Sequence, residues 1–501
     1  MINIKPLDAV TFVFFNDPRL KFLTFCCTIK LPFGFHLVGE TFDFFSRLYY
    51  TCSSWVNRGL YLSIPYDHRG LLDYSGHNGC QRNICVIWLS WHFKDIEMKS
   101  LPKIAICSVL SVLVFLTGCQ TRPKIEPYEI PESVGMSSSL LARVDKIIKE
   151  AIVRRDFPGA VILVIRKGKT VWRKAFGHSQ WVPELAPMDV SKIFDMASIT
   201  KPVATATSVM MLVEQGRFRL WDKVTDFVPE FVAYTDEEGK SGENARLWHL
   251  LTHTSGLPPY TDAEDLKDKY GYPITLESMI DHIAHLQKLT PPGEEFHYSC
   301  LGFITLSYIV KKVTGKTIAE FSRENIFEPL GMNHTFYTPA EEFLSLCVPT
   351  QVYDGKPLIG VVHDPLARLL GGVSGNAGLF STADDLAVFA EMMLNQGSFN
   401  GKRILSPLAV DRMTEIYRIT DFVGRGLGWD LESGYSTNQG DLFGPNAFGH
   451  TGYTGTSLII DPDTETIVIF LTNSVHPEDK GDIVSMRSRV ANVVAGSILI
   501  K

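Results

Sequence analysis

Long apolar stretches and an excess of positive charge are both missing from this chain. No apolar run reaches the roughly 18 to 20 residues that a membrane-spanning helix needs, which argues against a multi-pass membrane protein. Lysine and arginine total 48 against 55 aspartates and glutamates, and the net charge of −7 offers no basic field for a nucleic acid. With 45% hydrophobic and 21% charged residues, the 501-residue chain can bury one or two large cores.

Cysteine is scarce as well, and its distribution marks a break near Met98. Five of the nine cysteines lie in residues 1–97, together with 19 aromatic residues, an aromatic share well above that of the rest. This segment shows no sustained helical or alternating pattern, no cap signals and no motif. We therefore interpret residues 1–97 as upstream sequence that is translated only in error, with Met98 as the true start.

The residues after this break are typical of a bacterial lipoprotein signal peptide, residues 98–118. Lys99 and Lys103 form a basic start, residues 104–116 are apolar, and Leu-Thr-Gly-Cys follows, ending at Cys119. A peptidase that cleaves before Cys119 would free this cysteine to carry a lipid and hold the protein at a membrane. A short buried helix or an uncleaved anchor is the alternative. The expected location is the bacterial cell envelope, facing the periplasm.

A polar, proline-containing tether over residues 119–137 leads into the folded domain, residues 138–500. Apolar spacing predicts a helix from Ser138 that ends before Phe157, and a last helix over residues 483–498 that covers a sheet. Hairpins are predicted over residues 160–176 and 456–471. Strands at both ends of a helical middle predict one antiparallel sheet built from distant parts of the chain.

Ser198-Ile199-Thr200-Lys201 is the first motif with chemical meaning. Ser-x-x-Lys places the two side chains one helical turn apart, so the lysine amine can approach the serine hydroxyl and take its proton. The motif occurs by chance about once or twice in a chain of this length, and the alternative is a helix cap followed by a surface lysine. An apolar helix predicted over residues 203–213 favours the catalytic interpretation, because its burial leaves the serine at a cleft.

Two further motifs follow in order: Tyr298-Ser299-Cys300, and His450-Thr451-Gly452-Tyr453 at the start of a predicted strand. With Leu-Leu-Thr-His-Thr-Ser-Gly at residues 250–256 and Gly-Asn-Ala-Gly-Leu-Phe-Ser at residues 375–381, this order resembles the serine β-lactamase and penicillin-recognising hydrolase family, on its class C side. The resemblance runs from roughly Ser138 to the end of the chain.

The resemblance implies an α/β (α+β) fold with an antiparallel sheet flanked by helices, an inserted all-helical domain, and the active site in the cleft between them. The α/β part would span about residues 138–215 and 372–500, and the helical part about residues 216–371. No metal or organic cofactor is required.

The resemblance also implies roles for individual residues. Ser198 would be the nucleophile, Lys201 and Tyr298 would share the general-base work and then protonate the leaving group, and the backbone N–H groups of Ser198 and Tyr453 would form an oxyanion hole. The residues expected to bind substrate are His450, Thr451, Gly452, Tyr453 and Cys300.

Two of these positions depart from the family's commonest pattern. Cys300, a weak hydrogen-bond donor, stands where asparagine is usual. His450 stands where lysine is usual, and an unperturbed histidine has a pKa near 6.5. The fixed positive charge is therefore expected to be mostly missing at neutral pH and to return as the pH falls. Both changes weaken the case for an efficient β-lactamase and leave the acyl-transfer machinery intact.

Three classes of function are compatible with these motifs. The first is an envelope serine hydrolase that acts on peptidoglycan-like D-alanyl-D-alanine peptides, as a carboxypeptidase or a weak penicillin-binding protein. The second is an esterase or lactone hydrolase of the same fold, and the third a non-catalytic binding lipoprotein. A zinc enzyme is not favoured: His249 and His253 have the spacing of a helical zinc site, but Leu250 occupies the position of the required glutamate.

We predict that translation begins at Met98 and that the mature protein begins at a lipid-modified Cys119. Mass spectrometry of the protein from its native host should find no peptide from residues 1–97 and should find Cys119 as an acylated amino terminus. A peptide containing Phe42 or Trp55 would contradict the first part, and an unmodified Cys119 inside a longer peptide would contradict the second.

Overall fold

The computed structural model describes residues 10–14, 25–30, 36–38, 128–478, 480 and 483–500. The chain divides into two compact units, Met1–Phe115 and Leu116–Lys501. In the first unit, three strands that the sequence pattern did not predict pair antiparallel: β1 (Val10–Phe14), β2 (Phe25–Lys30) and β3 (His36–Val38). The predicted signal peptide and Cys119 lie outside the described residues.

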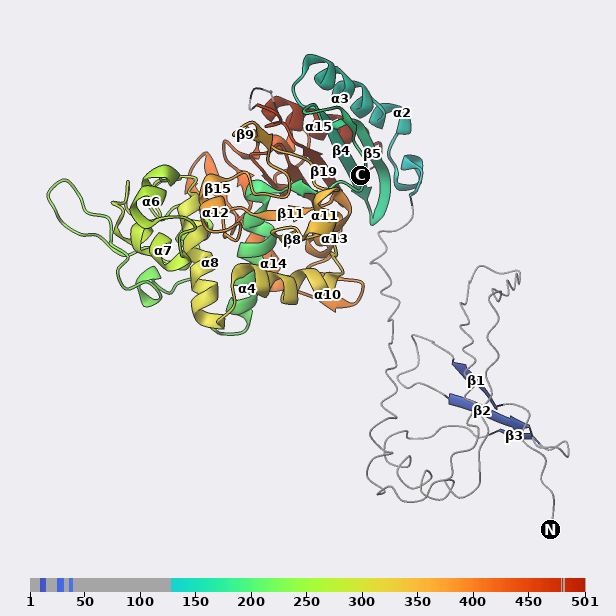
Figure 1. Cartoon of the computed structure of the whole chain (residues 1–501), viewed down its shortest axis with the longest axis horizontal. Helices are drawn as coiled ribbons and strands as arrows, with labels where there is room; N and C mark the ends of the chain where they lie inside the picture. Colours follow the sequence, from blue (N-terminus) through green and yellow to red (C-terminus); the bar gives the residue numbers. More distant parts are fainter. Residues whose placement is uncertain are drawn as a thin grey trace, which may run out of the picture. The chain divides into compact units, whose positions relative to one another are not determined.

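A nine-stranded antiparallel sheet forms the centre of the second unit (Figure 1), in the order β14-β15-β16-β17-β18-β19-β4-β5-β6. Its strands are β14 (Tyr417–Thr420), β15 (Val423–Arg425), β16 (Asp430–Glu432), β17 (Phe448–Thr451), β18 (Ser457–Asp461), β19 (Thr466–Thr472), β4 (Gly159–Arg166), β5 (Lys169–Gln180) and β6 (Ala186–Pro187). β19 pairs with β4 from end to end. The two predicted hairpins and the sheet built from distant parts of the chain are confirmed.

Helices cover both faces of this sheet, and the two central strands show why. Every residue of β4 and β19 is buried. Val161, Leu163 and Ile165 join the core on one face, whereas Ile162 and Val164 join the core on the other. Because successive side chains of a strand point to opposite faces, a run of apolar residues without polar alternation requires a cover on each side.

Three helices cover the second of these faces: α2 (Ser138–Leu141), α3 (Arg143–Arg154) and α15 (Val484–Gly496). Ser137 begins α2, because its hydroxyl accepts a hydrogen bond from the Leu140 amide. The predicted helices from Ser138 and over residues 483–498 are therefore confirmed, the first with an interruption at Ala142.

The remaining helices lie on the other side of the sheet or beyond it (Figure 1). They are α4 (Thr207–Glu214), α5 (Leu247–Leu251), α6 (Ala263–Tyr270), α7 (Leu276–His285), α8 (Cys300–Thr314), α9 (Ile318–Ser322), α10 (Glu328–Leu330), α11 (Glu341–Leu344), α12 (Pro365–Leu369), α13 (Ala383–Leu394) and α14 (Pro407–Thr414). Within the described residues, no helix is long and apolar enough to cross a membrane.

Short helical turns and strands connect these elements. The helical turns are η1 (Pro131–Val134), η2 (Ala197–Ile199), η3 (Lys201–Ala206), η4 (Val224–Asp226), η5 (Arg323–Phe327) and η6 (Ser436–Gln439). The small sheets are β7 (Phe194–Asp195) and β8 (Phe336–Tyr337) on either side of β11 (Leu379–Ser381), β9 (Val352–Tyr353) with β10 (Lys356–Pro357), and β12 (Ser398–Phe399) with β13 (Lys402–Arg403).

The region expected to be all-helical, residues 216–371, is therefore not purely helical. It contains β8, β9 and β10, each only two residues long. A strand of two residues is too short to produce an alternating pattern, and β8 exists because β11, from outside this region, pairs with it.

Candidate active site

Ser198 lies in a tight turn between β7 and the helix that begins at Lys201. Its neighbour Ala197 has a φ of +46°, a conformation that residues with a β-carbon rarely adopt. The Asp195 carboxylate holds this turn: one oxygen accepts a hydrogen bond from the Ala197 amide at 2.9 Å, and the other accepts one from the His363 amide at 2.7 Å. Burial raises the pKa of Asp195 to about 6, although both hydrogen bonds lower it.

Lys201 is completely buried and points its amine at Ser198. Its Nζ donates to the Ser198 hydroxyl at 2.9 Å, to the Asn376 carbonyl at 3.0 Å and to the Cys300 sulfur at 3.6 Å. The segment from Lys201 to Ala206 is a π-helix rather than the expected α-helix. The lysine nevertheless reaches the serine, as the Ser-x-x-Lys spacing predicts.

Tyr298 brings a third proton-transfer group to the same point from the loop before α8. Its ring centre lies 5.0 Å from the Lys201 amine. Burial raises the pKa of Tyr298, while the charge of Lys201 and hydrogen bonding with Ser198 and Lys201 lower it by less. Burial likewise raises the pKa of Cys300, so the phenol and the thiol are both neutral at neutral pH.

The pKa of Lys201 depends on these two partners. Burial lowers it, but negative charge on Cys300 or Tyr298 raises it, and the combined effect is a rise. Because the charge on each group shifts the pKa of the other, Lys201 and Tyr298 titrate as a coupled pair rather than as independent groups. Proton loss from the phenol is favourable only while the lysine keeps its charge.

The turn between β17 and β18 packs directly onto the Ser198 turn. Thr454 donates its hydroxyl to the Asp195 carbonyl at 2.7 Å, and Thr456 donates to the Met196 carbonyl at 3.2 Å. Gly452 is required by this approach, because a β-carbon there would lie 2.4 Å from the Met196 carbonyl oxygen. The strand end is thereby fixed beside the serine.

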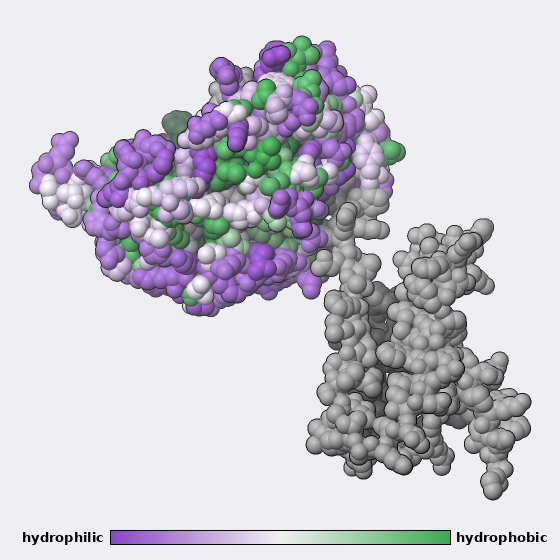
Figure 2. All heavy atoms as spheres, in the orientation of Figure 1, coloured by the Kyte–Doolittle hydropathy of each residue, from purple (hydrophilic) through white to green (hydrophobic). Residues whose placement is uncertain are grey.

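These segments line a cleft of about 430 Å³. Its lining residues are Ser198, Tyr298, Gly434, Tyr435, Thr437, Asn438, Thr451, Gly452, Tyr453, Ile483, Val484 and Arg487. In the space-filling view, apolar side chains gather in a band across the middle of the visible face, with polar side chains on both margins (Figure 2).

The expected substrate-binding residues divide into two groups. Thr451, Gly452 and Tyr453 line the cleft, and Tyr453 is 64% exposed. His450 is 1% exposed and Cys300 contacts Lys201, and neither is among the residues that line the cleft. The two positions that depart from the family pattern therefore lie behind the cleft wall.

His450 also differs from its expected titration. Burial lowers its pKa well below 6.5, and the charges of Arg425 and Lys201 lower it further. The expectation that His450 gains a proton at mildly acidic pH is therefore wrong, because it assumed an exposed ring. The ring Nδ1 lies 2.8 Å from the Thr451 carbonyl oxygen, which assigns the single proton to Nδ1.

An ion pair between Arg425 and Asp430 lies behind His450, and both side chains are completely buried. The Asp430 carboxylate is 4.0 Å from the His450 ring, and the Arg425 guanidinium is 6.0 Å from the centre of the Tyr298 ring. Burial lowers the pKa of Arg425 to about 10, so it remains charged at neutral pH.

The cleft's positive charge and one of its rings were not predicted from the sequence. Arg487 is 7% exposed, donates to the Gly452 carbonyl at 2.5 Å, and has a pKa lowered by burial to about 10. The sequence did contain an indication of Arg487, because this arginine directly follows Met486 on the apolar face of α15. Tyr435 stacks on Tyr298 with ring centres 4.6 Å apart, but it lies in a loop that carries no pattern.

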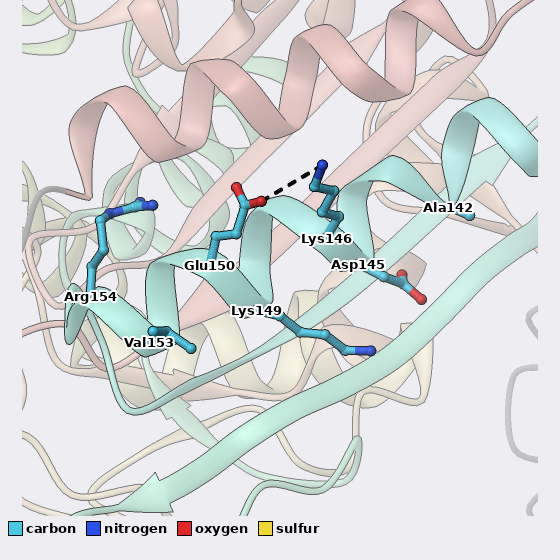
Figure 3. Close-up of a pocket in the computed structure, with 7 residues that line it drawn as sticks. All are labelled: Ala142, Asp145, Lys146, Lys149, Glu150, Val153 and Arg154. Atoms are coloured by element: carbon cyan, nitrogen blue, oxygen red, sulfur yellow. Dashed lines mark ion pairs between the residues drawn. The ribbon is translucent and has the colours of Figure 1, made fainter.

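Another hollow runs along the outer face of α3 and is charged and open (Figure 3). Its lining residues are Ala142, Asp145, Lys146, Lys149, Glu150, Val153 and Arg154. Asp145 is bonded to Trp172 and Lys174, and Lys146 pairs with Glu150 at 3.9 Å. A solvated helix face explains these pairs.

The histidines at zinc-like spacing serve the backbone instead. The ring Nδ1 of His249 accepts the Arg246 amide at 2.8 Å, and that of His253 accepts the Ser299 amide at 3.0 Å. Across the described ranges, no three His, Cys, Asp or Glu side chains are grouped so as to hold a metal ion.

Comparisons with known proteins find a matching family model and related sequences. The family model described as Beta-lactamase matches residues 144–491. The chain is 31% identical over 412 residues to the "N-acetylmuramyl-L-alanine amidase" of Bacillus subtilis (strain 168), covering 76% of this chain and 92% of that protein. It is 28% identical over 372 residues to the "Putative D-alanyl-D-alanine carboxypeptidase" of Escherichia coli (strain K12), covering 69% of this chain and 85% of that protein.

Two solved structures share the fold. EstCE1, described as a hydrolase with promiscuous acyltransferase activity, has a TM-score of 0.59 at 23% identity and covers 72% of this chain and 99% of its own. The octameric penicillin-binding protein homologue from Pyrococcus abyssi has a TM-score of 0.56 at 24% identity and covers 71% of this chain and 78% of its own. The expected antiparallel sheet with flanking helices is thereby confirmed.

We predict that Asp195→Asn slows acylation of Ser198 by at least about tenfold, because misplacing a reacting group by a fraction of an ångström is costly. Each oxygen of Asp195 accepts a different backbone N–H. The side-chain amide of asparagine would turn its NH2 group toward one of these two N–H groups, and that hydrogen bond would be lost. The measurement is the rate of labelling by a fluorophosphonate, and labelling at the wild-type rate would contradict the role of this carboxylate.

Asp385→Asn is the matched control, since burial also raises the pKa of Asp385 to about 6. Both of its donors, the His334 amide and the Thr335 hydroxyl, reach the same oxygen, so asparagine keeps both bonds. A carboxyl with a raised pKa loses stability as the pH rises through 6, and asparagine does not titrate. In urea unfolding, Asp385→Asn should be more stable than wild type by about 1 to 3 kcal/mol at pH 8 and show no such gain at pH 4.

Proposed function

The chain belongs to the beta-lactamase family and is a serine hydrolase, and we propose that Ser198 is its nucleophile. The observation that carries this proposal is the contact of the buried Lys201 amine with the Ser198 hydroxyl at 2.9 Å, beside Tyr298. A serine is a weak nucleophile unless an adjacent base accepts its proton, and Lys201 and Tyr298 are the groups in position to do so.

In the proposed mechanism, the Tyr298 phenol first loses its proton to solvent beside the charged Lys201 amine. Ser198 Oγ then attacks a substrate carbonyl while its proton passes to the Tyr298 phenolate. The carbonyl oxygen becomes an oxyanion, and the backbone N–H groups of Ser198 and Tyr453 are the proposed donors to it. As the tetrahedral intermediate collapses, the pair returns the proton to the leaving group, and an acyl-serine ester remains. A water molecule then attacks the ester by the same proton transfers, which frees Ser198.

Arg487 supports a carboxylate-bearing substrate. It is the cation that lines the cleft next to Gly452, and its Nε has no hydrogen-bond partner among the described residues. It therefore supplies the positive charge that a lysine at position 450 would have provided. We propose that the enzyme hydrolyses amide bonds of peptidoglycan-like peptides whose leaving group is an alanine with a free carboxylate.

The names of two relatives are consistent with this substrate class. A D-alanyl-D-alanine carboxypeptidase releases D-alanine, and an N-acetylmuramyl-L-alanine amidase cleaves an amide to L-alanine. The alternative is an esterase, and the neutral, buried His450 favours it, because this position adds no charge for a carboxylate.

We also propose that the enzyme is a lipoprotein of the bacterial envelope that faces the periplasm. The support is the sequence of residues 98–119 and the substrate class, since peptidoglycan lies outside the cytoplasmic membrane. A carboxylate-specific hydrolase anchored there would meet its substrate directly.

We predict that Ser198→Ala abolishes hydrolysis and covalent labelling while the fold remains. Lys201→Ala should lose a similar factor, because residues that act as one unit do not contribute additively. A fluorophosphonate or fluorescent penicillin, followed by mass mapping of the modified peptide, identifies the nucleophile. Activity that survives in Ser198→Ala would exclude the mechanism.

We further predict that Arg487→Gln lowers kcat/KM for a D-alanyl-D-alanine peptide and for N-acetylmuramyl-L-alanine by about 5- to 150-fold. This range corresponds to the roughly 1 to 3 kcal/mol of a charge-assisted hydrogen bond. A p-nitrophenyl ester should lose less than about threefold, because it has no carboxylate to bind. Arg489→Gln, on the exposed side of the same helix, is the control. An enzyme that prefers the ester and is indifferent to Arg487→Gln is the esterase of the alternative.

A further inference from the structure

We propose that His253 is a positioning residue that holds the Tyr298 phenol against Ser198 and Lys201. His253 lies in the turn that follows α5 and is 2% exposed. It is not among the residues that line the cleft. The inference rests on the proton-transfer role proposed for Tyr298 and assigns a function to a residue that touches no substrate.

His253 binds the backbone on both sides of Tyr298. Its carbonyl accepts a hydrogen bond from the His297 amide at 2.9 Å, and its ring Nδ1 accepts one from the Ser299 amide at 3.0 Å. The residues immediately before and after Tyr298 are thus fixed to a single residue of another segment. Rotation of the tyrosine backbone would break one or both of these bonds.

The His253 ring also forms the inner wall against which the phenol ring lies. The two ring centres are 4.3 Å apart with an angle of 31° between planes. Tyr435, which is 45% exposed, stacks at 4.6 Å from Tyr298. The buried histidine therefore defines the position of Tyr298, and the exposed tyrosine closes the stack from the cleft.

The backbone of His253 is held in an unfavourable conformation for this purpose. Its φ is +60°, which residues with a β-carbon adopt only when the surroundings over-determine it. The neighbouring turn is tightly packed, because a β-carbon on Gly256 would lie 2.2 Å from the Thr290 carbonyl oxygen. Strained residues of this kind cluster at functional sites.

The bond to Ser299 requires a neutral histidine ring. Burial lowers the pKa of His253 well below 6.5, and the charges of Arg425 and Lys201 lower it further. Because Nδ1 accepts the Ser299 amide, the single proton lies on Nε2. A protonated ring would have no acceptor for this amide. The surrounding cations therefore keep His253 neutral and preserve its hydrogen bond with Ser299.

A matched pair of variants separates the acceptor from the rest of the residue. Glycine and asparagine both tolerate a φ of +60°, but only asparagine places an oxygen where Nδ1 stands. We expect His253→Gly to lower the rate of Ser198 acylation by a p-nitrophenyl ester about 100-fold, within the range of general acid–base catalysis. His253→Asn should remain within about fivefold of wild type, and KM should change little in either variant.

The pH profile provides a readout that a purely structural role would not move. If the hydrogen bonds of His253 hold the phenol beside Lys201, then the acid limb of kcat against pH should shift in His253→Gly. In His253→Asn it should coincide with wild type. All rates are normalised to the folded fraction from near-ultraviolet circular dichroism. If His253→Gly does not fold, then a shifted acid limb in His253→Asn overturns the proposal and a coincident one supports it.

Combining these variants with Tyr298→Phe distinguishes the positioning role of His253 from the proton-transfer role of Tyr298. If His253 acts only through Tyr298, then His253→Gly should lower the acylation rate about 100-fold in the wild-type background. In the Tyr298→Phe background it should lower that rate hardly at all. Equal costs in both backgrounds, or full activity of folded His253→Gly, overturn the positioning role alone. Full activity of Tyr298→Phe instead overturns the proton-transfer role of Tyr298 proposed above.

Discussion

The buried amine of Lys201 is the constraint on which the rest of the site depends. A charged or strongly polar group removed from water is costly unless every donor finds a partner. Lys201 meets this demand with a hydroxyl, a carbonyl and a sulfur, contributed by Ser198, Asn376 and Cys300. These residues come from three distant segments, so satisfying one amine requires the nucleophile turn, the start of α8 and the loop before β11 to converge.

The large sheet makes this convergence possible by joining the ends of the folded chain. β4 follows the first helices and β19 precedes the last one, and their full pairing places the hairpin of β17 and β18 in the same sheet as the segment that leads to Ser198. Two threonine hydroxyls then fix the hairpin turn onto Asp195 and Met196. Long-range strand pairing therefore determines the distance between the serine and the cleft wall.

The features that could be predicted from the sequence are those with a local cause. The hairpins, the helices at both ends and the approach of Lys201 to Ser198 follow from periodicity and spacing. β14 to β16 and the two-residue strands were missed, because strands of two to four residues are too short to produce an alternating pattern. Arg487 and Tyr435 were missed for a different reason: their place in the cleft depends on how α15 and a patternless loop pack. The pKa of His450 was misjudged because burial cannot be read from a motif.

The positive charges around position 450 explain why a histidine, rather than the lysine expected from the family resemblance, can stand there. Arg425, Lys201 and Arg487 all act on His450, and burial weakens the screening between them. A lysine at this position would add a fourth cation to this cluster, with Asp430 already paired to Arg425. A neutral histidine avoids that repulsion, and Arg487 supplies the cleft with its positive charge from α15. With the role proposed for Arg487, the cation of the site comes from α15 rather than from β17.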